Sequence, residues 1–153
     1  MSQTKTGHCM CSCVSFVARN VPETFGACHC DMCKRWSGNV FNGVPVPSED
    51  LQLSGEGHIK RIQTSDWAER AICAECGSPL WYRITAEGPT TGTTNLALGL
   101  FDDTSDMTLG YEFFVDRKTS ANDLPKDRKQ FTEAETLALF APEDASHDQG
   151  DKQ

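Results

Sequence analysis

The stretch Cys28-His29-Cys30-Asp31-Met32-Cys33 places three cysteines within six consecutive residues. Two further clusters lie far from it along the chain: Cys9-x-Cys11, followed by Cys13, and Cys73-x2-Cys76. The polar start of the chain, MSQTKTG, contains no apolar export signal, so eight cysteines among 153 residues predict a protein of the reducing cytoplasm. Clustered cysteines in that compartment are typical of metal ligands or catalysts, and the short C-x-C spacings disfavour disulfides.

The spacing of the clusters predicts two metal sites of different kinds. A C-x2-C turn directs two thiolates at one tetrahedral zinc ion, with Zn–S distances of about 2.3 Å, and two pairs from distant segments would form a closed site. The C-x-C-x2-C run supplies three thiolates, which leaves one position for another ligand, for water or for a substrate. Three protein ligands with an exchangeable position are typical of catalytic zinc, whereas four are typical of structural zinc.

Cys13 and His29 leave an alternative open at the second site. Cys13 is expected as a small buried apolar residue, but as a fourth ligand it would make both sites structural. His29 stands between two cysteines and points away from them in an extended segment, which favours a place outside the ligand set. The alternative to an enzyme is a non-catalytic, zinc-stabilised β module that binds a protein partner. A fourth protein ligand would favour the module, and water or a bound thiol would favour the enzyme.

Short segments that alternate or are rich in β-branched and aromatic residues predict an all-β domain. Gly43 and Pro45 favour a sheet edge for one of the strands, residues 1–8 are expected to be a loose lead-in, and the segment after Cys33 predicts a turn or short helix. The nine expected strands are 9–19, 24–27, 40–46, 51–53, 57–63, 69–73, 80–85, 95–100 and 111–115.

The C-terminal part contains one helix with clear start signals. The sequence Thr132-Glu133-Ala134-Glu135 fits a capping box, which predicts a short helix over residues 132–140. We expect residues 1–131 to form the zinc-binding domain and the acidic tail, residues 141–153, to be disordered.

Composition argues against several classes of partner. Lys and Arg together number 14 and Asp and Glu 22, which gives a formal net charge of −8 and disfavours nucleic acid and anionic membrane surfaces. No apolar run is long enough for a transmembrane helix. Apolar residues make up a modest 38% of the chain, so zinc is expected to contribute to folding, by about 10 kcal/mol for a structural ion.

The three cysteine motifs together resemble the glutathione-dependent formaldehyde-activating enzyme family, which includes the centromere protein V type. They are residues 7–11 (GHCMC), 27–38 (ACHCDMCKRWSG) and 72–80 (ICAECGSPL), in this order. The stretch 95–114 and the turn at 123–125 also match, so the resemblance covers residues 7–131. The chain departs from the pattern at Ser12, where Gly is usual, and at Cys13, which is an additional thiol.

The resemblance implies a β-tent of short antiparallel strands built around two zinc ions. It implies a structural zinc held by four cysteines and an active-site zinc held by three, with the activity of S-(hydroxymethyl)glutathione synthase. This carbon–sulfur lyase reversibly joins formaldehyde to glutathione, its co-substrate, so the expected partners are a small-molecule thiol and aldehyde. The implied ligand sets are Cys9, Cys11, Cys73 and Cys76 for the structural ion, and Cys28, Cys30 and Cys33 for the catalytic ion.

Glutathione is anionic, so a basic rim is expected beside the open site. Lys34 and Arg35 would contact a glutathione carboxylate, with Trp36 as a packing face; alternatively, the two cations are solvated and Trp36 belongs to the core. Asp31 and His29 are the candidates for moving the proton. Either activation of the substrate thiol or polarisation of the carbonyl oxygen would suit the ion, and the sequence leaves their order open.

Overall fold

The computed structural model describes residues 3–123, 132, 134, 135 and 138. It divides into two units, residues 1–119 and residues 120–153, each of which is described by itself. The strands are β1 (Gln3–His8), β2 (Ser15–Val21), β3 (Thr24–Cys28), β4 (Phe41–Pro47), β5 (Leu51–Ser54), β6 (Ile59–Gln63), β7 (Ala68–Cys73), β8 (Pro79–Ile84), β9 (Thr93–Ala97) and β10 (Thr108–Phe113).

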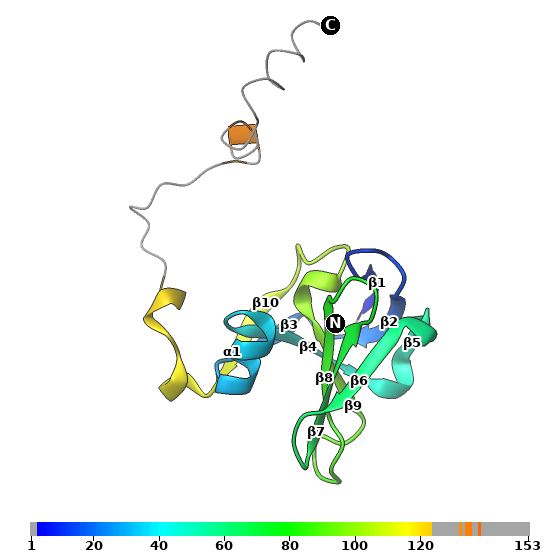
Figure 1. The fold of residues 1–153 in the computed structure, drawn as a ribbon, viewed down its shortest axis with the longest axis horizontal. Coiled ribbons are helices and arrows are strands. Elements are labelled where there is room, and N and C mark those ends of the chain that lie inside the picture. Colours follow the sequence, from blue (N-terminus) through cyan, green and yellow to red (C-terminus); the bar gives the residue numbers. More distant parts are fainter. Residues whose placement is uncertain (1–2, 124–131, 133, 136–137, 139–153) are drawn as a thin grey trace, which may run out of the picture. The chain divides into compact units, whose positions relative to one another are not determined.

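One short α-helix and several 3₁₀ turns connect these strands (Figure 1). None of the helices in the described part of the chain is long and apolar enough to span a membrane. The helical segments are α1 (Asp31–Ser37), η1 (Ser48–Asp50), η2 (Glu56–His58), η3 (Leu98–Leu100), η4 (Val115–Arg117) and, in the second unit, η5 (Ser120–Asn122).

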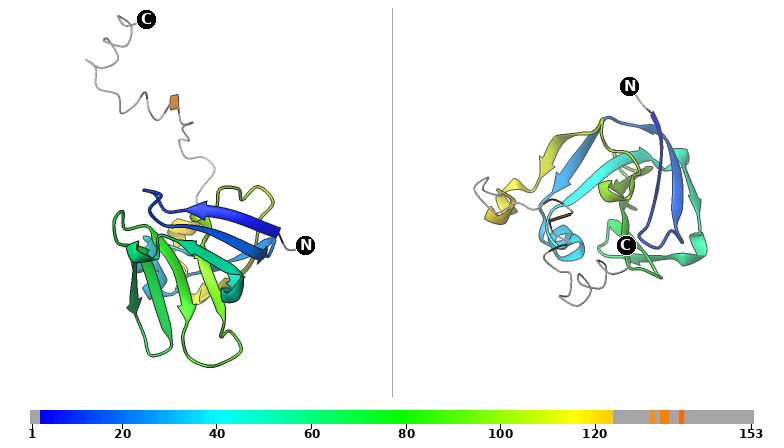
Figure 2. Two further views of the ribbon diagram at one scale, coloured as in Figure 1. Left: turned by 90° about the vertical axis from the view of Figure 1, so that its right-hand side faces the viewer. Right: turned by 90° about the horizontal axis from the view of Figure 1, so that it is seen from above.

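The strands form two sheets, so the predicted all-β class is confirmed. The smaller sheet has the order β1-β2-β5 and the larger one the order β10-β3-β4-β9-β8-β7-β6. Figure 2 shows the blue strands β1 and β2 running across the green strands of the larger sheet. One pair departs from the antiparallel expectation, because β10 runs parallel to β3. A parallel neighbour needs a long connection, and β10 reaches the free edge of β3 only after the chain has built β4 to β9.

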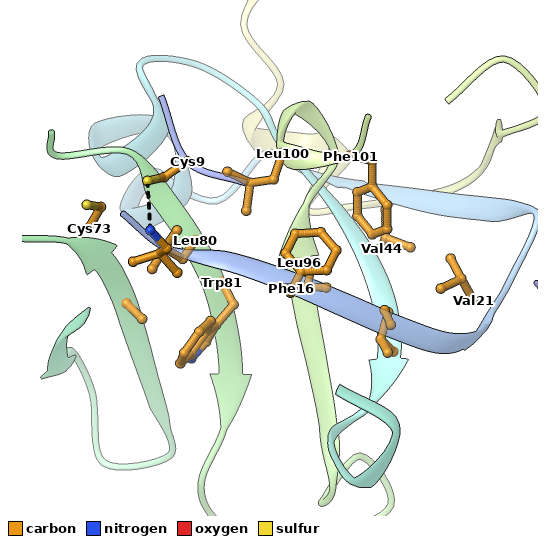
Figure 3. Close-up of a cluster of buried hydrophobic side chains, with 14 of the residues drawn as sticks. Cys9, Phe16, Val21, Val44, Cys73, Leu80, Trp81, Leu96, Leu100 and Phe101 are labelled. Carbon is orange, nitrogen blue, oxygen red and sulfur yellow. Dashed lines mark hydrogen bonds between the residues drawn. The ribbon is translucent and has the colours of Figure 1, made fainter. Parts of the chain in front are cut away.

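Side chains from both sheets share one hydrophobic core (Figure 3). Trp81, Val44 and Leu96 of the larger sheet are completely or almost completely buried, and Phe16 of the smaller sheet packs edge-to-face on Phe101 with 5.1 Å between ring centroids. The core also includes Cys9 and Cys73, so the cysteine clusters border the packed interior.

The predicted strand over residues 9–19 is wrong in its first half. The chain forms β1 before it, where a loose lead-in was expected, and then a turn over residues 9–14. Hydrogen bonds from Ser12 N to Cys9 O (3.1 Å) and from Cys9 N to Val14 O (2.9 Å) close this turn. The alternating C-x-C-x-C pattern imitates a strand, but Ser12 adopts a left-handed conformation with φ of 65° that an extended chain does not have.

The expectation that β4 lies at a sheet edge is also wrong, because β4 runs between β3 and β9. Its pairing with β3 involves only residues Phe41 to Gly43, whereas its pairing with β9 extends through Pro45 to Pro47. Pro45 therefore lies beyond the end of the β3 ladder, where its missing N–H breaks no hydrogen bond between these two strands.

The capping box predicted for the second unit is present. Thr132 N donates to Glu135 Oε2 at 2.7 Å, and Glu135 N donates to Thr132 Oγ1 at 3.2 Å. Ala134, Glu135 and Ala138 are helical. The remaining positions of the expected helix 132–140 and the whole tail 141–153 lie outside the described residues.

Substitution of Gly55 by Ala should destabilise the fold by about 2 kcal/mol or more. Gly55 has a φ of +81°, and a Cβ there would collide with the carbonyl oxygen of Cys13 in the β1–β2 turn. The matched control is Gly57→Ala, since no atom lies within 4 Å of a Cβ built at Gly57. Denaturant unfolding of the zinc-loaded proteins measures both effects, and an equal midpoint for the two variants would contradict the role assigned to Gly55.

Candidate metal centres and active site

Four cysteine sulfurs from two distant segments meet beside the core. Cys9 and Cys11 come from the β1–β2 turn, Cys73 ends β7, and Cys76 lies in the turn before β8. All four sulfurs lie within 4.8 Å of one another, with 3.6 Å between Cys9 and Cys11 and 3.8 Å between Cys11 and Cys73. A tetrahedral zinc ion with Zn–S distances near 2.3 Å holds its sulfurs about 3.8 Å apart, so this set fits a closed zinc site.

Ser78 connects the two segments of this four-cysteine cluster. Its hydroxyl lies 3.1 Å from Cys76 Sγ and accepts a hydrogen bond of 3.0 Å from Met10 N in the other segment. The Ser78 hydroxyl lowers the pKa of the Cys76 thiol to about 5 through that hydrogen bond, with help from the Ser78 backbone. Cys9 Sγ accepts a similar hydrogen bond of 3.3 Å from Val14 N, the contact drawn at Cys9 in Figure 3. These donors stabilise thiolates, the form in which cysteine binds metal.

Three cysteine sulfurs form a second group at the junction of β3 and α1. Cys28 ends β3, Cys30 caps α1, and Cys33 lies in the first turn of α1. Their sulfurs lie within 4.8 Å of one another, and Cys30 Sγ accepts a hydrogen bond of 3.3 Å from Cys33 N. The helix ends at Gly38, which has a φ of 89°. This three-cysteine cluster therefore combines a strand end with a helix N-terminus and needs only six residues of chain.

The three thiols do not ionise independently. A hydrogen bond from Cys33 lowers the pKa of Cys28 to about 5, and the Cys30 backbone and the charge of Arg70 act in the same direction. The same contact, together with burial, raises the pKa of Cys33. Without a cation the contact between them thus favours a thiolate on Cys28 and keeps a proton on Cys33, because adjacent negative charges repel one another. Three thiolates at this place need a positive ion among them.

No fourth ligand joins the three-cysteine cluster from the described part of the chain. Cys13 is exposed in the β1–β2 turn, so the expectation that it is buried is wrong. His29 is 2% exposed, and its Nε2 lies 2.8 Å from Glu112 Oε1. Its partner is a carboxylate of β10, which agrees with a place outside the ligand set.

Arg70 of β7 is a site residue that the sequence analysis missed. It is 4% exposed and donates from Nη2 to Cys33 Sγ at 3.3 Å and from Nη1 to Thr64 Oγ1 at 2.8 Å. Its guanidinium carbon lies 5.3 Å from the ring centroid of Trp36 and 4.9 Å from that of Tyr82, and its Nε has no hydrogen-bond partner among the described residues. The sequence carries no signal for this role, because Arg70 reaches Cys33 only through the fold, across 37 positions of the chain.

A cavity of about 700 Å³ opens beside the three-cysteine cluster. The three cysteines and Arg70 form part of its wall, and strands β3, β4, β8 and β10 supply much of the rest. Among the apolar and aromatic residues that line it are Met32, Phe41, Trp67, Tyr82, Tyr111 and Phe113. The cysteines are therefore accessible from a space large enough for an organic molecule.

The predicted basic rim, Lys34, Arg35 and Trp36, is not part of the cavity wall. Lys34 Nζ donates to Arg117 O at 2.7 Å and lies 3.3 Å from Asp31 Oδ1, while Arg35 is exposed. Trp36 packs on Phe41 with 5.0 Å between ring centroids, and also on Arg70. Asp31 and Arg117 line the cavity in their place, joined by a hydrogen bond of 2.6 Å.

The substitution Arg70→Met should weaken zinc binding at the three-cysteine cluster about 10- to 100-fold, because it removes the cation that touches Cys33 Sγ. The four-cysteine cluster should keep its affinity. Competition with a chromophoric chelator resolves the two affinities. The control is Arg83→Met. Like Arg70, Arg83 stacks on an aromatic ring, that of Trp81 at 4.8 Å, but its hydrogen bonds go to Thr94 and Glu69. Two unchanged affinities in Arg70→Met would contradict the role of Arg70.

Comparison with known proteins gives a consistent assignment. Residues 4–117 match the family model for glutathione-dependent formaldehyde-activating enzymes. An uncharacterised lyase of Schizosaccharomyces pombe is 24% identical over 131 residues, covering 86% of this chain and 93% of that protein. A candidate glutathione-dependent formaldehyde-activating enzyme of Podospora anserina is 32% identical over 93 residues, covering 56% of this chain but 43% of that protein.

A solved structure supports the fold alone. The crystal structure of a Rhodobacter sphaeroides protein superposes with a TM-score of 0.53 at 15% identity, covering 70% of this chain and 98% of the other. The family is shown by sequence: the match to the family model over residues 4–117, together with the two sequence relatives, confirms the resemblance seen in the cysteine motifs. The chain belongs to the glutathione-dependent formaldehyde-activating enzyme family.

Proposed function

We propose that this protein is a zinc-dependent carbon–sulfur lyase of the S-(hydroxymethyl)glutathione synthase type. It would reversibly join a thiol such as glutathione to an aldehyde such as formaldehyde at the three-cysteine cluster. The observation that carries the proposal is the set of three sulfurs on the wall of a cavity, without a fourth ligand among the described residues. The same observation disfavours the non-catalytic module, which would need a closed second site.

The two clusters would hold ions with different tasks. Cys9, Cys11, Cys73 and Cys76 would bind the structural zinc, and Cys28, Cys30 and Cys33 the catalytic zinc. Zinc held by three thiolates would supply a Lewis acid with one position open to a substrate. Arg70 would offset the negative charge that the three thiolates bring to the cavity, because it contacts Cys33 Sγ directly.

The reaction itself is an addition without a redox step. A C–S bond forms between the thiol sulfur and the carbonyl carbon, the S–H bond breaks, and the proton ends on the former carbonyl oxygen. Tyr82 and Tyr111 line the cavity, and burial raises the pKa of each hydroxyl, so both keep their hydrogen at neutral pH and can donate to that oxygen. Of the two candidates for the thiol proton, Asp31 lines the cavity and His29 does not.

Contacts to glutathione remain part of the proposal. Lys34 or Arg35, with Trp36 as a packing face, would have to act from outside the described cavity wall. Arg117 lines the cavity and is better placed for a carboxylate.

We also propose a cytoplasmic location. All eight cysteines are free thiols, the form that metal binding needs, and a reducing compartment keeps thiols in that form.

Metal content tests the division between the two clusters. The substitution Cys30→Ser should leave a folded protein that binds one zinc ion and has no lyase activity, whereas wild type should bind two. Cys76→Ser should unfold more easily, because the four-cysteine cluster joins the two sheets. The exposed Cys13 gives the control, and Cys13→Ser should keep both ions and full activity. Unchanged zinc content in Cys30→Ser would refute the assignment.

Zinc-loaded protein should accelerate formation of the adduct between formaldehyde and glutathione, measured by exchange NMR against the uncatalysed rate. The substitution Tyr82→Phe should lower the rate about a hundredfold, because it removes a hydroxyl donor while keeping the ring that stacks on Arg70. Tyr111→Phe removes the other hydroxyl of the wall, and comparison of the two rates separates the contributions of the two hydroxyls. If wild type loaded with two zinc ions shows no acceleration, the proposed activity is wrong.

A further inference from the structure

The cavity is much larger and more apolar than formaldehyde requires. Formaldehyde has two heavy atoms, whereas about 700 Å³ is the size of a pocket for a drug-sized ligand. Five aromatic side chains besides Tyr82 form part of its wall: Phe41, Trp67, Tyr111, Phe113 and Phe114. Trp67, Phe113 and Phe114 are each more than half exposed, so an empty cavity leaves a large aromatic surface in water.

The aromatic wall is built by specific backbone features. The ring of Tyr111 lies on Gly26, at a place where any Cβ would collide with it. Phe113 follows on the same face of β10, with 5.0 Å between the centroids of the two rings. The parallel pairing of β10 with β3 sets Tyr111 opposite Gly26 and Phe113 opposite Cys28 in the strand register. The wall and the three-cysteine cluster are therefore parts of one structure.

The charges of the cavity do not suit a strongly anionic ligand. Among the described residues, Asp31, Arg70 and Arg117 are the charged groups of the wall. Asp31 and Arg117 are joined at 2.6 Å, and Arg70 is stacked between two rings with its Nη2 on Cys33. Glutathione carries two carboxylates and one ammonium group, so Arg117 would accommodate one carboxylate at most, and the aromatic wall offers no charged partner for the other groups.

We propose that the substrate carries an aromatic or aliphatic group of about six to ten carbon atoms next to the carbon–sulfur bond that is formed or broken. This inference rests on the proposed function and adds the substrate class to it. The apolar group would lie on Tyr111 and Phe113 while the reacting atoms reach the three cysteines. It can belong either to the aldehyde or to the thiol, since both end at the same C–S bond.

Two series of substrates distinguish these sources. In the first, glutathione is fixed and propanal is compared with hexanal, two aldehydes with the same carbonyl chemistry. In the second, formaldehyde is fixed and propane-1-thiol is compared with hexane-1-thiol. Each rate constant is divided by its uncatalysed value. A buried methylene group contributes roughly fourfold to binding, so we expect a preference of at least about tenfold for the six-carbon substrate in one series.

Variants on one strand locate the effect. Phe113→Ala should abolish most of the preference for six carbons, because it removes a ring from the wall. Leu109→Ala is the matched control: Leu109 lies on the same strand and is 50% exposed, but it does not line the cavity. It should keep both the preference and the activity.

Binding of benzyl alcohol, an unreactive aromatic probe, separates this inference from the lyase activity. Benzyl alcohol should shift the indole N–H resonance of Trp67 saturably, and it should bind Phe113→Ala at least threefold more weakly than Leu109→Ala. If no substrate pair is turned over but the probe binds in this way, the lyase activity is wrong and the apolar ligand class stands. If catalysis occurs without a preference in either series, or if the probe does not shift Trp67, the apolar ligand class is wrong.

Discussion

The sulfur atoms of Cys9, Cys11, Cys73 and Cys76 lie within 4.8 Å of one another, and two of their pairs are 3.6 and 3.8 Å apart. Thiolates this close repel one another, so the cluster needs either a cation among the sulfurs or protons on them. The connection between the two sheets depends on that requirement. The four-cysteine cluster joins the β1–β2 turn of the smaller sheet to the end of β7 in the larger one. Strand β7 also carries Arg70, three residues before Cys73. Arg70 donates a hydrogen bond to Cys33 of the three-cysteine cluster. One short strand thus carries both a sulfur of the four-cysteine cluster and the arginine that contacts the three-cysteine cluster.

The two clusters are built from the same type of residue, yet their surroundings differ. With zinc bound, four thiolates give a formal charge of 2 − 4 = −2, which Ser78 and backbone N–H groups stabilise by hydrogen bonds. Three thiolates give 2 − 3 = −1, and the contact with Arg70 brings the local sum to zero. A neutral centre retains more Lewis acidity than a dianionic one, and it faces a cavity instead of the packed core.

The cysteine spacing was enough to predict which cysteines lie together in each cluster. A metal site needs only a few ligands, and here they are close in sequence, as in Cys28, Cys30 and Cys33, or come as two short pairs. The strand boundaries around them were harder to predict. The alternation of Cys9, Cys11 and Cys13 imitates a strand, and only the left-handed Ser12 shows the turn, at the position where the family usually has Gly. Arg70 and Tyr111 could not be assigned from sequence, because their contacts depend on strand register and on the parallel pairing of β10.

The basic residues after Cys33 illustrate why neighbours in sequence are poor guides to a helical site. Successive residues of a helix point about 100° apart, so Arg35, two positions after Cys33, turns away from the face that Cys30 and Cys33 share. Lys34, four positions after Cys30, lies nearer to that face, but its Nζ donates to Arg117 O and pairs with Asp31. Trp36, three residues after Cys33, returns to that face and stacks on Arg70. Helix α1 and the end of β3 therefore place the three cysteines, whereas a distant strand, β10, supplies Tyr111 and Phe113 of the cavity wall. If the three-cysteine cluster binds the catalytic zinc as proposed, substitutions in β10 would change the substrate preference and leave the seven proposed metal ligands in place.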